Sequence, residues 1–289
     1  MRQSPINFDT NNLIVEHNNI SITAEGTDIS SGSIDNTNTY ELKCTYTGGY
    51  VNYTSPTETS QWNLAQFHFH APAEHTIDNQ QYDLCMHNVF IKNGTTDNYL
   101  VLGILWELDA NTEDDSFITS LNLTNVAGTS VSLSNVGLSS LYNWTNSEQK
   151  FNYQGGLTTP SCDERVEWMV VRTIKKINQS QLDLFRNLWA LNSSFASGNG
   201  NNRAIQNTNR RLVNLIGYEA ENTTTSTTVV SEEDDKEWIL PVLIVLGLLL
   251  CATTSIAIVM TICYLKQNRR KNYTGDTTCY VANTATEVN

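Results

Sequence analysis

Positive charge is scarce in this chain of 289 residues, where 17 Lys and Arg stand against 30 Asp and Glu. The formal net charge is −13 at pH 7. Nucleic acids and sulfated glycans are bound through clusters of basic side chains. The composition therefore argues against both as partners.

Histidine is also rare, with five in the chain, yet His68, His70 and His87 lie close together in the sequence. A β-strand places residues two apart on one face, so His68 and His70 would project together with Gln66 beside them. His87 would come from the next strand. Three histidines and an open fourth position are typical of a catalytic zinc site. Unconnected core or surface histidines are the alternative, which this clustering disfavours.

Long uncharged apolar runs are absent except at residues 239–265. That run is long enough to span a bilayer, with Trp238 and Tyr264 near its ends. The flank before it is acidic and the flank after it is basic, which orients the following tail toward the cytosol. A buried core helix is the alternative. We expect a domain at 1–217 outside the cell or in a lumen, an acidic Thr-rich stalk at 218–237, a transmembrane helix in the lipid bilayer at 238–265 and a cytoplasmic tail at 266–289.

Alternation and turn signals predict strands at 64–70, 82–91, 99–108 and within 164–175. Residues 109–150 look rich in loops, with a short helix near 114–121. Leu182, Phe185, Leu188 and Trp189 have helical spacing and predict a helix that begins at Ser180 as its N-cap.

The sequence QFHFHAPAEHTID at residues 66–78 resembles the α-class carbonic anhydrases. Further segments agree with that family in the same order: Gln3 to Asn7, Val101 to Ile104, Leu157 to Cys162 and Asn201 to Arg203. The resemblance extends over residues 3–217. It implies a mainly β fold, in which a large twisted, mostly antiparallel sheet of about ten strands carries a few short surface helices. The transmembrane helix would be added to this fold.

The resemblance also implies an activity, the reversible conversion of carbon dioxide to bicarbonate. His68, His70 and His87 would hold Zn²⁺, which lowers the pKa of bound water to about 7. Thr158, hydrogen-bonded to Glu74, would orient the nucleophile, and Thr159 would help to place bicarbonate. The remaining substrate-binding residues would form an apolar wall: Val89, Val101, Leu157, Val166 and Trp168.

The outer partners of the metal ligands include one departure from the family. Gln66 and Asn201 would each orient a histidine through their amide oxygens. The third partner is usually Glu in this family, but the sequence has Cys85, a weak hydrogen-bond acceptor. We expect this substitution to affect catalytic efficiency more than the presence of the bound metal. Cys85 as a fourth zinc ligand, which would close the site, is a less favoured alternative.

A second departure from the family lies in the segment Thr47-Gly48-Gly49-Tyr50, which has no histidine. In fast members of the family a histidine of this segment, at the mouth of the active site, moves the proton from the metal-bound water to buffer. His75 is expected to be a structural core residue and His17 a surface residue. We therefore expect turnover that is limited by proton release and responds to buffer.

The domain has three cysteines, and Cys162 matches a family cysteine that pairs with one preceding the Gln3 segment. We expect a signal peptide and the first stretch of the domain to precede Met1. Pairing with Cys44 and a free thiol remain alternatives.

Eight N-x-S/T sequons agree with an outward-facing domain. Their asparagines are Asn19, Asn52, Asn93, Asn122, Asn143, Asn178, Asn192 and Asn222.

The competing function is a cell-surface binding or adhesion module with weak or no catalysis, as in family members that lack zinc ligands. The complete ligand set and the acidic composition disfavour it. A serine hydrolase has no support, because no G-x-S-x-G motif is present. Anchored members often dimerise, and the sequence identifies no interface for a homodimer.

Overall fold

The computed structural model describes residues 1–15, 20–35, 42–123, 130–189, 200–217 and 260–266. The chain forms two units, Met1–Glu221 and Asn222–Asn289. In the second unit only 260–266 are described, and they are helical. No helix within the described ranges is long and apolar enough to cross a membrane. Nearly all of the predicted stalk, membrane span and tail lies outside those ranges.

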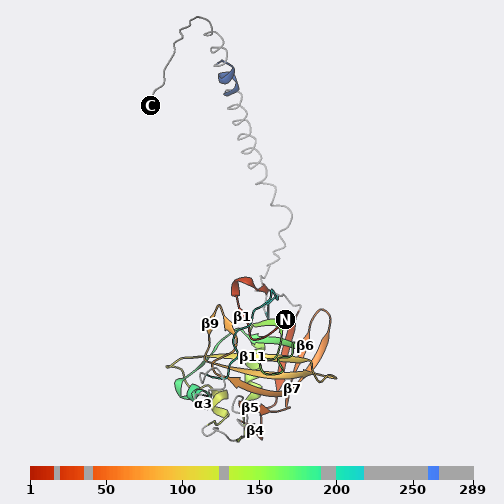
Figure 1. Cartoon of the computed structure of the whole chain (residues 1–289), viewed down its shortest axis with the longest axis vertical. Coiled ribbons are helices and arrows are strands. Elements are labelled where there is room, and N and C mark those ends of the chain that lie inside the picture. The colour runs from red at the N-terminus through yellow and green to blue at the C-terminus, as the bar shows by residue number, and fades with distance from the viewer. Residues whose placement is uncertain (16–19, 36–41, 124–129, 190–199, 218–259, 267–289) are drawn as a thin grey trace, which may run out of the picture. The chain divides into compact units, whose positions relative to one another are not determined.

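Strands dominate the first unit (Figure 1). Its strands are β1 (Asn7–Phe8), β2 (Ile14–Val15), β3 (Ser21–Gly26), β4 (Gly32–Asp35), β5 (Leu42–Thr45), β6 (Gly49–Thr54), β7 (Thr59–His70), β8 (Thr76–Ile77), β9 (Gln80–Gln81), β10 (Leu84–Lys92), β11 (Tyr99–Leu108), β12 (Ser130–Leu133), β13 (Lys150–Gly155), β14 (Val166–Val171), β15 (Lys175–Ile177) and β16 (Asn214–Ile216). Its helices are α1 (Ser116–Ser120), α2 (Leu138–Ser147) and α3 (Gln179–Trp189), with a 3₁₀ turn, η1, at Thr10–Asn12.

One large sheet follows the order β12-β4-β5-β7-β10-β11-β14-β13-β16-β2, with β6, β3 and β15 paired alongside. Most neighbouring strands are antiparallel, whereas β14 and β15 run parallel to β11 and β2 runs parallel to β16. The mainly β fold with a large sheet and few helices is confirmed, and the sheet is mixed. The long strands β7, β10 and β11 lie side by side at its centre.

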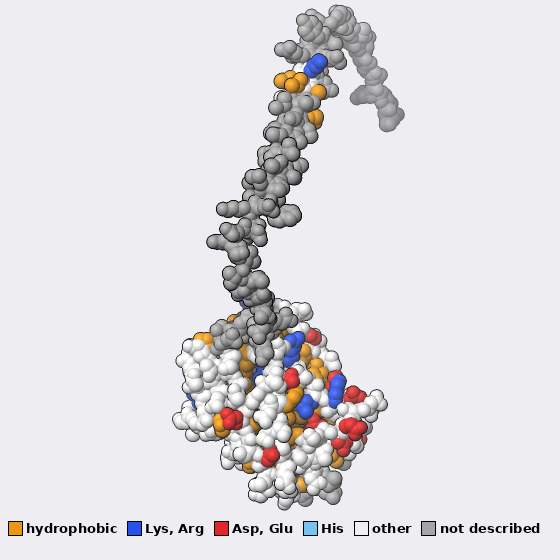
Figure 2. All heavy atoms as spheres, turned by 180° about the vertical axis from the view of Figure 1, so that it is seen from behind, with side chains coloured by type: hydrophobic (Ala, Val, Ile, Leu, Met, Phe, Trp, Pro, Cys, Tyr) orange, Lys and Arg blue, Asp and Glu red, His pale blue; other side chains and the backbone are white. Residues whose placement is uncertain are grey.

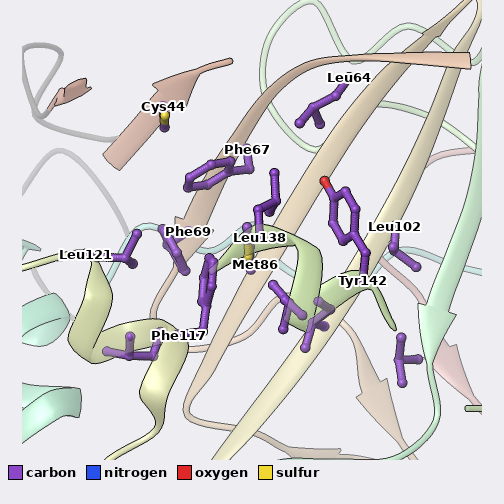
Figure 3. Close-up of a cluster of buried hydrophobic side chains, with 14 of the residues drawn as sticks. Cys44, Leu64, Phe67, Phe69, Met86, Leu102, Phe117, Leu121, Leu138 and Tyr142 are labelled. Atoms are coloured by element: carbon purple, nitrogen blue, oxygen red, sulfur yellow. The ribbon is translucent and has the colours of Figure 1, made fainter. Parts of the chain in front are cut away.

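The central strands are buried on both faces, and alternate residues form two separate cores. On one face Phe67, Phe69, Met86 and Leu102 pack beneath α1 and α2 (Figure 3). On the other face lie the predicted histidines and their apolar neighbours. Figure 2 shows that most of the described surface on the face in view is uncharged.

The predicted short helix near 114–121 is confirmed as α1, whose N-cap is Asp115. The predicted helix at 180–189 is confirmed as α3, but its cap was misassigned. The Oδ1 of Asn178 accepts hydrogen bonds from the amide of Gln181 at 3.0 Å and from the Ser180 hydroxyl at 2.8 Å. Asn178 therefore caps the helix, because its side chain reaches the free amide of the first turn.

Helix α2 was missed in the region predicted to be rich in loops. Its buried residues are Leu138, Leu141, Tyr142 and Thr145. Their spacing is that of one helix face. The many Ser and Asn residues of this segment concealed the pattern, because those residues favour turns and caps.

Candidate metal centre

Strand pairing brings the three histidines together. In the register of β7 and β10, His87 lies opposite His68, and Cys85 lies opposite His70. All three imidazoles are buried, and one ligand atom from each lies within 4.8 Å of the others. The predicted grouping of His68, His70 and His87 is therefore present on one face of the two central strands.

The outer nitrogen of each ring has a neighbour that fixes its orientation. His68 Nδ1 lies 2.8 Å from the Oε1 of Gln66, and His70 Nδ1 lies 3.1 Å from the backbone oxygen of Asn201. His87 Nε2 lies 3.5 Å from the Sγ of Cys85. The rings thus present Nε2 of His68, Nε2 of His70 and Nδ1 of His87 for metal binding.

Asn201 acts differently from the prediction. Its side-chain amide accepts from the amide of Ala71 at 3.0 Å and donates to the backbone oxygen of Phe69 at 2.9 Å. The side chain thereby fixes the segment around His70, and the backbone carbonyl of Asn201 contacts the His70 ring. The hydrogen bond to the imidazole therefore comes from the backbone of Asn201, while its amide oxygen accepts from Ala71.

The environment keeps the His68 and His87 rings uncharged. Burial, followed by the charge of the neighbouring His70, lowers the pKa of His68 well below its usual range. The same two causes lower the pKa of His87. Neutral imidazoles bind divalent zinc without first losing a proton. The Nε2 of His70 is buried and has no hydrogen-bond partner within the described residues, so an ion at the cluster would supply one.

Glu74 lies next to this cluster with only 2% of its surface exposed. Its Oε1 accepts from the amide of Arg203 at 2.8 Å, and its Oε2 lies 3.8 Å from Nδ1 of His87. Oε2 has no hydrogen-bond partner in the part of the chain that the structure describes. The bond between Thr158 and Glu74 therefore stays a prediction.

A cleft of about 270 Å³ opens beside the histidines. Most of the predicted substrate-binding residues line it, together with Gln66 and Thr158: Val89, Val101, Leu157, Thr159 and Trp168. Val166 is buried but is not among the lining residues. Val166 lies on β14, where it pairs with Tyr99 of β11 and precedes Trp168 by two residues. The indole nitrogen of Trp168 donates to the Gly156 oxygen at 3.0 Å.

Three further lining residues were missed by the sequence analysis: Lys43, Tyr99 and Pro160. Pro160 directly follows Thr159 in a segment already assigned to the site, so its neighbours carried a signal. Tyr99 begins β11, two residues before Val101 and on the same strand face. Lys43 is 25 residues away from His68 in sequence, and only the pairing of β5 with β7 brings it there.

The remaining predictions for this region concern two histidines that are not metal ligands and the three cysteines of the domain. His75 is fully buried, as expected, and its Nε2 lies 2.7 Å from the Tyr153 hydroxyl. His17 falls outside the described residues. Cys44, Cys85 and Cys162 are free thiols, so the alternative pairing of Cys162 with Cys44 is not formed. A partner upstream of Met1 remains a prediction.

Three buried imidazoles beside a cleft with one apolar wall define the class of the site, a mononuclear zinc centre of the catalytic type. Residues 1–216 match the family described as eukaryotic-type carbonic anhydrase, and the chain belongs to that family. His68, His70 and His87 fit the zinc that such a centre requires.

Named relatives agree with this assignment. Alpha carbonic anhydrase 7 of Arabidopsis thaliana is 31% identical over 158 residues, which make up 54% of this chain and 54% of that protein. The carbonic anhydrase of Dunaliella salina is 28% identical over 246 residues, covering 73% of this chain and 39% of that protein. The chain thus spans about half the length of the curated relatives it matches.

Solved structures share the fold. The halotolerant carbonic anhydrase from Dunaliella salina is 26% identical, with a TM-score of 0.59, over 75% of this chain and 88% of that one. A carbonic anhydrase from Chlamydomonas reinhardtii in complex with acetazolamide is also 26% identical, with a TM-score of 0.58, over 74% of this chain and 90% of that one.

Proposed function

We propose that this chain catalyses the reversible hydration of carbon dioxide to bicarbonate and a proton, with zinc as its cofactor. The observation that carries the proposal is the cluster of His68, His70 and His87, whose ligand atoms lie within 4.8 Å of one another. One wall of the adjoining cleft is apolar, formed by Val89, Val101, Leu157 and Trp168, and a substrate without a net dipole needs such surroundings.

The ligand residues would hold the metal, and their partners would hold the ligands. When bound, zinc supplies Lewis acidity that brings the pKa of water near 7, which provides a nucleophile at neutral pH. Gln66 fixes the His68 ring, and the Asn201 carbonyl fixes the His70 ring. Correct tautomers leave a lone pair on each inner nitrogen.

The remaining residues would orient the reactants. The amide of Arg203 holds the Glu74 carboxylate in place. Glu74 would accept a hydrogen bond from the Thr158 hydroxyl. The Thr158 hydroxyl, which then has its oxygen free to accept, would aim a lone pair of the nucleophile toward the cleft. Val89, Val101 and Trp168 would exclude water from the carbon dioxide position, and Thr159 would help to place bicarbonate.

The proposal is tested by stopped-flow hydration of carbon dioxide with the zinc-loaded, full-length chain. His87→Ala is expected to abolish the activity and to lower the zinc content below one ion per chain. His17→Ala is the control, since His17 is not one of the three predicted ligands. A wild-type chain that binds no zinc would favour the binding or adhesion module instead, whereas one zinc ion per chain without any hydration would indicate a closed or mispositioned metal.

We further propose that residues 238–265 anchor the chain in a lipid bilayer, with 1–217 on the outer side. The uncharged run at 239–265 and the basic residues after it support this orientation. Exposed sequon asparagines at Asn52, Asn93, Asn122 and Asn143 are compatible with it. Epitope tags at both termini would test it: in intact cells protease should remove the N-terminal tag alone. Removal of both tags, or of neither, would contradict the topology.

A further inference from the structure

Arg203 contacts two parts of the site at once. Its backbone amide donates to the Oε1 of Glu74 at 2.8 Å. Its Nη1 donates to the backbone oxygen of Ser4 at 2.7 Å and, at the longer distance of 3.5 Å, to that of Leu157. Leu157 begins the Thr158 segment, residues 157–160. One residue therefore contacts both Glu74, the predicted acceptor, and the segment that carries Thr158, the predicted donor.

Ser4 gives Arg203 a second connection to this part of the backbone. Ser4 is fully buried, and its hydroxyl oxygen accepts from the amide of Gly156 at 3.2 Å. Gly156 stands two residues before Thr158. The Arg203 guanidinium thus reaches the backbone before Thr158 by two routes, directly at Leu157 and through Ser4.

Packing alone gives the Thr158 segment little support. Thr158, Thr159 and Pro160 line the cleft of about 270 Å³ and also a second hollow of about 380 Å³. Arg203 borders this second hollow as well. A segment beside open space has fewer van der Waals contacts to fix it, so hydrogen bonds to its backbone contribute more to its position.

We propose that Arg203 is a positioning residue for carbon dioxide hydration, which fixes the Thr158 hydroxyl relative to the Glu74 carboxylate. The inference rests on the proposed function and adds to it a residue that touches neither the metal ligands nor the substrate. The backbone contact to Glu74 is kept when the side chain is replaced. Removal of the guanidinium therefore releases the Thr158 segment alone and leaves the carboxylate held.

Stopped-flow hydration of carbon dioxide by the zinc-loaded, full-length chain tests the inference. Arg203→Gln is expected to lower kcat/KM by roughly 10- to 100-fold, because a displacement of about 1 Å can cost that much in rate. Zinc affinity, measured by chelator competition, should stay within about twofold of the wild type, since the three histidines keep their partners.

The comparison of kcat with kcat/KM separates positioning from a loss of folded protein. Turnover is expected to be limited by proton release, so at low buffer concentration kcat should fall less than kcat/KM. A smaller folded fraction would lower both equally. Arg203→Lys keeps the charge but has a single donor group, and it should show a smaller loss of the same kind. It also provides the comparison if Arg203→Gln does not fold.

Arg211→Gln is the matched control. The Arg211 guanidinium also donates to backbone oxygens, among them that of Gln3 at 2.7 Å and that of Gln154 at 3.0 Å, but to neither Ser4 nor Leu157. Its kcat/KM per folded chain should equal that of the wild type. A wild-type kcat/KM in the Arg203 variants, or equal losses of kcat and kcat/KM, would overturn the inference and leave the proposed function standing. A wild-type chain without hydration would overturn both.

Discussion

The two faces of the central strands β7, β10 and β11 carry different kinds of residue at adjacent positions. Phe67, Phe69 and Leu102 fill the core that α1 and α2 cover (Figure 3). Gln66 and His68 point to the opposite face, where the cleft opens. A one-residue slip in register would exchange the faces and destroy both at once. The core packing that stabilises the fold therefore also fixes the positions of the metal ligands.

The difference teaches what each face requires. The core face needs volume and apolar contact, because its stabilisation comes from burial and close packing. The histidine face also needs particular atoms at particular positions, since each ring requires an oriented hydrogen-bond partner. Changes to the core face should lower stability, and changes to the histidine face should lower metal affinity.

The largest effect is expected from neighbours on β11 that face opposite ways. Leu102→Ala, fully buried in the covered core, should lower the free energy of unfolding by about 2–5 kcal/mol. Val101→Ala should cost less stability, because it removes fewer buried carbon atoms than Leu102→Ala and leaves its gap at the wall of the cleft. Guanidinium unfolding of the full-length chain, followed by tryptophan fluorescence, measures both.

Zinc affinity supplies the control for this pair. Chelator competition should give Leu102→Ala the wild-type zinc affinity at temperatures where the variant remains folded. If Leu102→Ala weakened zinc binding as much as it weakened the fold, the two faces would not be energetically separable. The comparison would then be wrong.

The next effect concerns the His68 partner. Gln66→Ala removes the oxygen 2.8 Å from His68 Nδ1, which should lower zinc affinity by roughly 10- to 100-fold. The free energy of unfolding of the metal-free protein should change little, since Gln66 is only half buried. Gln61→Ala is the control on the same strand, because Gln61 is exposed and hydrogen-bonds Asn93. Equal zinc affinities for the two variants would refute an orienting role for Gln66.

The pH dependence of the free energy of unfolding should reveal the burial of His75. Burial is the main cause that lowers the pKa of His75 to about 3, whereas in the unfolded chain it is near 6.5. Below pH 6.5 the unfolded chain therefore binds a proton that the folded chain excludes. The contribution of His75 to stability is full above pH 6.5 and falls by about 1.4 kcal/mol per unit as the pH drops toward 3.

His75→Gln removes this titration. Between pH 7 and pH 5 the metal-free wild type should lose about 2 kcal/mol more stability than the variant. A chelator in both samples excludes metal release as the cause. Parallel losses in the two proteins would mean that His75 titrates normally and is not shielded by its surroundings.

Much of the fold and the site could be predicted because the relevant signals are local. The separation of His68 and His70 by two residues is enough to place both rings on one strand face. His87 lies on the next strand predicted along the chain, at 82–91. Antiparallel pairing of that strand with the one at 64–70 therefore completes the cluster. Alternation and turn signals likewise predicted the central strands at 64–70, 82–91 and 99–108, which the structure forms as β7, β10 and β11.

The missed features depend on contacts that residue types do not encode. Lys43 reaches the cleft through the pairing of β5 with β7, and nothing in its own segment indicates that pairing. Asn201 contacts His70 through its backbone, which every residue type possesses. Val166 and Trp168 lie two residues apart on β14 and share a strand face, yet Trp168 lines the cleft and Val166 does not, so alternation alone does not distinguish them.

The smallest effect is expected at Cys85, where the comparison can be sharpened within the site itself. Burial, followed by the charge of Glu74, raises the pKa of the Cys85 thiol well above its usual range, so sulfur stays protonated and uncharged. At 3.5 Å it is a weak acceptor for the outer nitrogen of His87. Cys85→Ala should therefore lower zinc affinity by only about threefold, well below the loss expected from Gln66→Ala.

Two further measurements separate the roles open to this sulfur. Cys85→Ser places a stronger acceptor of similar size beside His87 and should bind zinc at least as tightly as the wild type. Cobalt-loaded wild type should lack a sulfur-to-metal charge-transfer band, because Sγ lies at the outer nitrogen of His87 while Nδ1 is the atom that approaches Glu74 and the cluster. A strong charge-transfer band would instead make Cys85 a fourth ligand and close the position that catalysis requires.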